Sequence, residues 1–188
     1  MLYLDDANLL EEHGAGLTLR RGHFAVQDGA GGGIAEVDTI PAHATTVRCA
    51  GRLVTRAFVI GHHHLYSALA RGMPMPATAP DSFVAVLERI WWNLDRQLDA
   101  DIIRASALAG GLEALRRGCT FIIDHHSSPN AATGSLHGIA EALEELGLGH
   151  LLCIEISDRD GAAARLEAGA IPILRPLRRS ACAGSKAT

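Results

Sequence analysis

Short apolar stretches alternate with polar and Gly-rich segments over the first 57 residues of this 188-residue chain. The apolar stretches cover residues 17–19, 24–26, 34–37 and 45–47. Such alternation, broken by turn residues, predicts short antiparallel strands. The glycine-rich run 29–33 lacks the Lys-Ser/Thr pair and the following helix of a phosphate-binding loop, so it indicates a hairpin loop.

A different pattern begins after residue 80. Asp81-Ser82 offers an N-cap, and apolar residues follow at helical spacing at Phe83, Val86, Leu87, Ile90 and Trp91. Two further helices are expected over residues 100–117 and 135–146, each ending at a glycine and leading into an apolar strand, 120–123 and 151–156. Helix, glycine and apolar strand recurring in this order predict a parallel sheet built from βα units.

The apolar run 58–60 leads through Gly61 into three histidines, His62, His63 and His64. Residues i and i+2 of a strand point to the same face, so His62 and His64 can converge on one metal ion. Parallel barrel strands carry their chemistry at their C-terminal ends. An accident of composition and a remnant of an affinity tag are the alternatives, although a tag would stand at a terminus. We favour metal ligands.

Four stretches in order resemble the amidohydrolase superfamily: residues 51–72 with the histidines, 90–96, 121–129 and 155–161. The resemblance is to its cytosine deaminase and chlorohydrolase-like branch, and there to the aminohydrolases called SsnA. It implies a small β-sandwich followed by a barrel, and one divalent metal, Zn or Fe. It also implies further ligands and a catalytic acid/base on later strands. This chain ends before those strands, so its catalytic residues are unknown and its metal is incompletely ligated.

Length leads to the same expectation. A complete (β/α)₈ barrel takes about 250 residues, whereas 131 remain from Phe58 onward. We therefore expect an α/β fold with three domains or segments. Residues 1–57 form an N-terminal β-sandwich portion, residues 58–161 a partial (β/α)₈ TIM-type barrel of about three βα units, and residues 162–188 a divergent basic tail.

The tail differs in charge from the rest of the chain. Residues 162–188 carry five basic residues against one acid, and the preceding part carries a net charge of −8. Such a shift marks a boundary or a change of origin. The hypotheses are a frameshift or early stop near residues 161–169, and a natural short paralogue with its own basic ending. In either case we expect little order here.

Polar residues also gather at the other strand ends. Asp124, His125 and His126 follow the second predicted barrel strand, and Glu155, Ser157, Asp158 and Arg159 end or follow the third. The substrate-binding candidates are His125, His126, Arg159, for a substrate carboxylate, and Trp92, for stacking on an aromatic ring. The alternatives are loop-holding hydrogen bonds, a local Asp158–Arg159 ion pair and packing of the Trp91–Trp92 pair. We expect Asp124 to be structural.

Composition narrows the function classes. Apolar residues make up 48% and charged residues 20%, which is ordinary for a soluble globular protein. No apolar run approaches the length of about 18 residues that a membrane span needs. The N-terminus lacks the basic start of a secretory signal, so a cytoplasmic location without membrane partners is expected. Four widely spaced cysteines without CxxC argue against a zinc ribbon or disulfide framework. Nucleic-acid binding has no support, because the short basic stretch lacks interleaved aromatic residues.

Two functions from different classes follow. The first is metal-dependent hydrolysis or deamination at a C–N bond of a small cyclic nitrogenous substrate, with this chain as the N-terminal portion of the enzyme. The second is a catalytically inactive fragment or a partner-dependent subunit. The second predicts an open sheet edge and uncovered apolar faces, with a homo-oligomer or a complementing chain as the partner.

Overall fold

The computed structural model describes residues 1–27, 32–157, 159–160 and 173–175. The chain divides into two compact units, Met1–Ala57 and Phe58–Thr188. Both helices and strands are present, so the expected mixed α/β class is confirmed. No helix among the described residues is long and apolar enough to cross a membrane.

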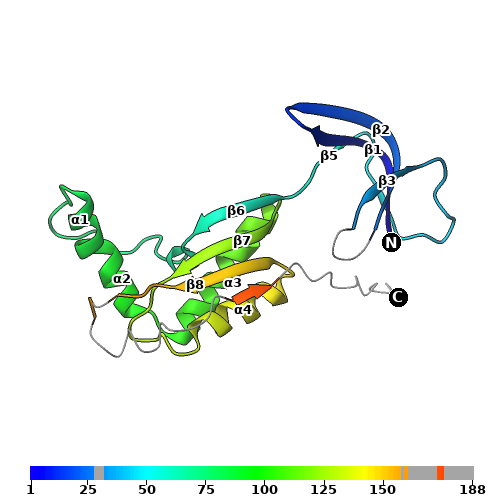
Figure 1. Cartoon of the computed structure of the whole chain (residues 1–188). Helices are drawn as coiled ribbons and strands as arrows, with labels where there is room; N and C mark the ends of the chain where they lie inside the picture. The colour runs from blue at the N-terminus through cyan, green and yellow to red at the C-terminus, as the bar shows by residue number, and fades with distance from the viewer. Residues whose placement is uncertain (28–31, 158, 161–172, 176–188) are drawn as a thin grey trace. The chain divides into compact units, whose positions relative to one another are not determined.

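The N-terminal unit is a mixed sheet with the strand order β3-β2-β1-β4, in which β5 also pairs with β1 (Figure 1). Its strands are β1 (Leu2–His13), β2 (Gly16–Val26), β3 (Ile34–Val37), β4 (Thr46–Arg48) and β5 (Leu53–Val54). Leu4, Ala7, Leu9, Phe24 and Cys49 form its core. The described residues of this unit lie in one sheet, and the sandwich stays a prediction.

The strands of this unit differ from the expected short antiparallel set. β1 and β2 pair antiparallel over almost their full length, because Gly14, with a φ of +60°, closes a tight turn between them. The strands β4 and β5 pair with β1 in parallel. The strands β2 and β3 on either side of the predicted hairpin loop pair antiparallel, and Gln27 N–H donates to the Gly33 carbonyl at 2.9 Å. Residues 28–31 of the loop itself lie outside the described residues.

The second unit is a four-stranded sheet in the order β6-β7-β8-β9. The strands are β6 (Phe58–His63), β7 (Cys119–His126), β8 (Gly149–Ile154) and β9 (Ile173–Arg175). The pairs β6–β7 and β7–β8 are parallel, as predicted, and β9 is antiparallel to β8. The rest of the predicted basic tail lies outside the described residues.

The predicted helices are present, and the first begins at the expected Asp81-Ser82 cap. A continuous helical segment consists of α1 (Phe83–Val86), the π-helix η2 (Leu87–Trp91) and α2 (Trp92–Gln97). The hydroxyl of Ser82 caps α1 by accepting from Ala85 N–H. The longer helices are α3 (Ala100–Arg116) and α4 (Ser135–Glu145), and a 3₁₀ turn, η1 (Leu65–Ser67), follows β6.

Helices α3 and α4 pack on each other and cover one face of the second sheet (Figure 1). Ile122 and Leu152 of the sheet are fully buried in this core together with Ile103, Ile139 and Leu143 of the helices. Residues of the other face, Phe121, Ile123, Leu151 and Cys153, are only partly buried. One face of the sheet is therefore packed, and the other is not covered by the described residues.

The contact between α3 and α4 depends on Gly111. A Cβ added there would lie 2.8 Å from Leu146 and 2.9 Å from Leu143. We predict that Gly111→Ala lowers the free energy of unfolding by about 1–3 kcal/mol through overpacking, although alanine favours helices. Gly138→Ala in α4 is the matched control, because nothing lies within 4 Å of its added Cβ; it should gain up to about 1 kcal/mol. Urea denaturation of both variants measures this, and a stabilised Gly111→Ala would contradict it.

Candidate metal centre

The end of β6 contains an extra residue relative to β7. Ile60 pairs with Ile122 and His63 pairs with Asp124, so three steps along β6 match two along β7. Such a bulge redirects the side chains beyond it. Ile60 packs on the helix-covered core, and His63 approaches α3, where its ring lies 3.9 Å from a Cβ built on Gly110. By strand alternation, His62 and His64 point to the opposite face.

The rings of His62 and His64 meet there. Their Nε2 atoms lie 3.1 Å apart, and the rings pack edge to face with centroids 4.8 Å apart. Nδ1 of His64 lies 2.9 Å from the carbonyl oxygen of His125. Because a carbonyl can only accept, Nδ1 carries the proton and Nε2 of His64 presents a lone pair. The side chain of His64 is thus fixed in the tautomer that suits a metal ligand.

The pair fits a divalent metal. Two nitrogens at 2.0–2.1 Å from a tetrahedral zinc ion lie about 3.3 Å apart, close to the 3.1 Å between the two Nε2 atoms. Neutral imidazole is also a common ligand type for zinc and iron. In the part of the chain that the structure describes, no group of three or more His, Cys, Asp or Glu side chains could hold a metal. The histidines therefore offer two ligands of a set that needs more.

His125 and His126 alternate between the two faces of β7. His125 is partly buried, and its ring packs edge to face on His64 with centroids 5.6 Å apart. His126 is fully buried, and its Nε2 lies 2.8 Å from the hydroxyl of Ser128. Burial lowers the pKa of His126 to about 4, so it is neutral at pH 7. Of the two, His125 is the one beside the proposed ligands.

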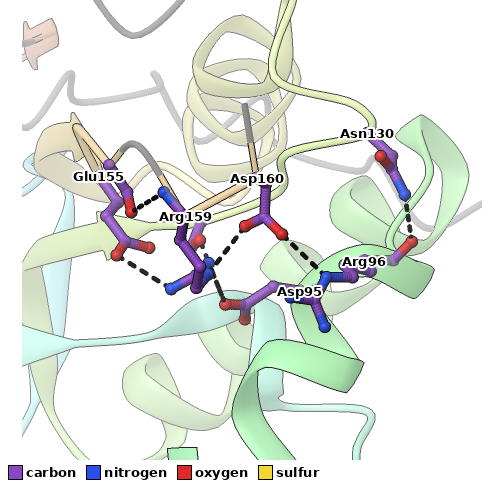
Figure 2. A network of polar contacts seen from close by, with 8 residues as sticks. Asp95, Arg96, Asn130, Glu155, Arg159 and Asp160 are labelled. Atoms are coloured by element: carbon purple, nitrogen blue, oxygen red, sulfur yellow. Dashed lines mark hydrogen bonds and ion pairs between the residues drawn. The ribbon is translucent and has the colours of Figure 1, made fainter. Parts of the chain in front are cut away.

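Arg159 lies at the centre of an ionic network (Figure 2). Its guanidinium donates to Asp160 at 2.8 Å, to Asp95 at 3.1 Å and to Glu155 at 3.2 Å. The charge also lies over the ring of Trp92, 4.9 Å from its centroid. Arg159 thus contacts both α2 and the end of β8. The predicted partner Asp158 lies outside the described residues, and Arg159 pairs with three other carboxylates.

The network extends along α2. Arg96 donates to the second oxygen of Asp160 at 2.8 Å, and the amide of Asn130 donates to the Arg96 carbonyl at 2.8 Å (Figure 2). It therefore connects α2 with the segments that follow β7 and β8. The two substrate-binding candidates Arg159 and Trp92 contact each other here, so each has a partner within the chain.

Two residues beside the histidines, Tyr66 and Trp91, and the buried Asp95 were not selected from the sequence. The rings of Tyr66 and Trp91 lie 5.8 and 6.2 Å from the ring of His64. Asp95, one helical turn beyond Trp91, is buried, and it accepts a bond from the hydroxyl of Ser127 at 3.3 Å. The available signal was the i, i+4 spacing of Trp91 and Asp95, which places them on one helix face. Trp91 is the last residue of the π-helix η2, which the sequence does not reveal, and its ring contacts that of His64.

Comparison with known proteins identifies the fold. No protein-family model matches the chain. A variant of atrazine chlorohydrolase from Arthrobacter aurescens TC1, solved with zinc and atraton, superimposes with a TM-score of 0.65 at 21% identity, covering 81% of this chain and 35% of that one. Guanine deaminase from E. coli gives 0.65 at 15% identity, covering 87% and 39%. An amidohydrolase from a Sargasso Sea sample gives 0.59 at 22%, covering 84% and 35%.

These structures are members of the amidohydrolase superfamily, in agreement with the resemblance of the sequence. At such identities the likeness establishes the fold alone: the fold of this chain matches part of the fold of each of these structures. It spans little more than a third of the length of these structures.

Removal of the Arg159 charge should destabilise the second unit. Asp95 is buried and would lose its cation, so we predict that Arg159→Ala lowers the free energy of unfolding by about 3 kcal/mol. Arg117→Ala is the control, because its pair with Glu113 is exposed on both sides; it should change stability little. Chemical denaturation compares them, and equal small effects would contradict the prediction.

The stability should also depend on pH through Asp95. Burial raises its pKa to about 6, even though Arg159 lowers it. The unfolded chain releases this proton near pH 4, so the stabilising contribution of protonated Asp95 is present below pH 4 and is lost as the pH rises through 6. The Asp95→Asn variant has no carboxyl proton at this position, so it lacks this pH dependence. The stability of the wild type relative to Asp95→Asn should fall by up to about 3 kcal/mol from pH 4 to 7; a constant difference in urea titrations would refute this.

Proposed function

We propose that this chain supplies the first two metal ligands, His62 and His64, of an enzyme that hydrolyses or deaminates a C–N bond in a cyclic nitrogenous compound. The observation that carries the proposal is the 3.1 Å approach of the two Nε2 atoms. The fixed tautomer of His64 supports it, since its Nδ1 is bonded to the His125 carbonyl. The amidohydrolase-like fold supports it at the level of the superfamily.

A bound zinc or iron ion supplies Lewis acidity and lowers the pKa of water to about 7 in such sites. The residues of this chain bind the ion and orient the side chains that bind it. His62 and His64 bind the ion through Nε2, and the His125 carbonyl keeps His64 in the correct tautomer. Trp91 and Tyr66 line the histidine cluster with apolar surface, which limits the access of water.

The predicted substrate-binding residues have different roles in this proposal. His125 faces the cluster and is placed to contact a substrate. Trp91, rather than Trp92, presents the ring nearest to His64. Arg159 and Trp92 keep α2 in its position through their contact with each other. His126 stabilises the end of β7 through its hydrogen bond with Ser128. The cytoplasmic location and the closer relation to SsnA aminohydrolases belong to the same proposal.

The remaining ligands and the catalytic acid/base must come from residues outside the described part of this chain. Catalytic zinc sites use three protein ligands, and the described residues bring two together. We therefore propose activity for a longer or complemented protein. A partner-dependent subunit without catalysis of its own is the second candidate. It is favoured by the partly exposed sheet face and by Val59 at 60% exposure on the edge strand β6.

Metal content tests the proposal. The untagged protein, dialysed against Zn²⁺ and analysed for elements, should retain zinc, and His62→Ala/His64→Ala should retain less than about a tenth as much. The control is His43→Ala/His137→Ala, which removes two exposed histidines elsewhere. Zinc retained equally by all three proteins, or by none, would sink the proposed metal site. Zinc lost only in the first variant would justify a screen of cyclic nitrogenous substrates.

A further inference from the structure

Leu65, the residue directly after His64, is held at both of its backbone polar groups. Its N–H donates to Oδ1 of Asp124 at 2.7 Å, and its carbonyl accepts from the hydroxyl of Ser106 at 2.6 Å. Asp124 and Ser106 are both 0% exposed. They belong to β7 and α3, so two separate elements fix the position of this one residue.

The side chain of Leu65 is enclosed as well. It is 0% exposed, and a Cβ added to Gly110 of α3 would lie 2.7 Å from its Cδ2. Only glycine leaves room for this approach. The contacts at the N–H, the carbonyl and the side chain together leave Leu65 no freedom to shift.

The position of Leu65 determines that of His64. His64 is the N-cap of η1, and its carbonyl accepts from both the N–H and the hydroxyl of Ser67, at 3.0 and 2.7 Å. The next residue of β7, His125, accepts the bond from Nδ1 of the same histidine. Asp124 and His125 thus hold successive points of the segment that presents the imidazole.

We propose that Asp124 and Ser106 are positioning residues for His64: by fixing the Leu65 backbone, they hold Nε2 of His64 beside Nε2 of His62 for a divalent cation. This inference rests on the proposed metal site. A ligand role for Asp124 fits the geometry less well. Its Oδ1 already accepts a hydrogen bond from Leu65 N–H. In the strand register Asp124 lies opposite His63, which approaches α3 on the side of the sheet away from His62 and His64.

The test compares Zn²⁺ affinity by equilibrium dialysis for Asp124→Ala, Asp124→Asn and Ser106→Ala in the full chain. Asp124→Ala and Ser106→Ala should bind Zn²⁺ about 10–100-fold more weakly, which is the usual effect of removing groups that orient a ligand. Asp124→Asn should stay within about threefold, because its amide oxygen can still accept from Leu65 N–H.

Two controls remove similar bonds away from His64. Asp99→Ala deletes a carboxylate that accepts from Ile102 N–H, and Ser135→Ala deletes a buried hydroxyl that donates to the Ala132 carbonyl. Both should bind Zn²⁺ like the wild type. Circular dichroism confirms folding in each case. If Asp124→Ala fails to fold, Ser106→Ala with its Ser135→Ala control carries the test.

A second readout needs no metal. ¹⁵N NMR of the apo protein reports the His64 tautomer, and amide exchange reports the Leu65 N–H bond. Asp124→Ala should accelerate Leu65 exchange and mix the His64 tautomers, whereas the controls should not. Wild-type affinity in folded Asp124→Ala and Ser106→Ala would overturn the inference and leave the metal site intact. If the wild type binds no Zn²⁺, the proposed function fails, and an unchanged tautomer in Asp124→Ala would overturn the positioning role as well.

Discussion

The pairing register between β6 and β7 is the constraint on which the candidate site depends. One extra residue in β6 between Ile60 and His63 separates the three histidines between the faces of the sheet. His63 approaches α3, and His62 and His64 meet on the other side. An ideal register would place Ile60, His62 and His64 on one face, toward the packed helices, where two imidazoles could not share an exposed cation.

The strand β7 fixes the position of the residues at the end of β6 and directly after it. Its inner residue Ile122 contributes to the core, and Asp124 and His125 near its end form hydrogen bonds with Leu65 and His64, which directly follow β6. A buried carboxylate is costly unless it is bonded, and burial raises the pKa of Asp124 to about 6 although the bond from Leu65 N–H opposes this. The hydrogen bond from Leu65 N–H offsets part of this cost, and it fixes the backbone of Leu65.

Buried charge also organises the segment from Trp92 to Arg96. Asp95 and Arg159 are far apart in the sequence, and their contact fixes α2 against the end of β8. Such pairs add little net stability, because desolvation offsets most of the Coulomb attraction. Their effect is to select one arrangement of α2. The same arrangement directs Trp91 toward His64 and Trp92 toward Arg159, so the ionic network shapes the aromatic surroundings of the histidines.

The sequence by itself determined the α/β class, the Ser82 cap of the first helix, the glycine stops of the two longer helices, the parallel pairing of β6, β7 and β8, and the delivery of His62 and His64 at a strand end. These features are local, because periodicity, capping and turn residues act within a few positions. Tertiary structure alone decided the β6 bulge, the partners of Arg159, the orientation of Trp91 and the contacts of Asp124 and Ser106 with Leu65. The bonds at Leu65 join residues 59 and 41 positions apart. Such contacts depend on strand register and helix packing, and no local pattern encodes them.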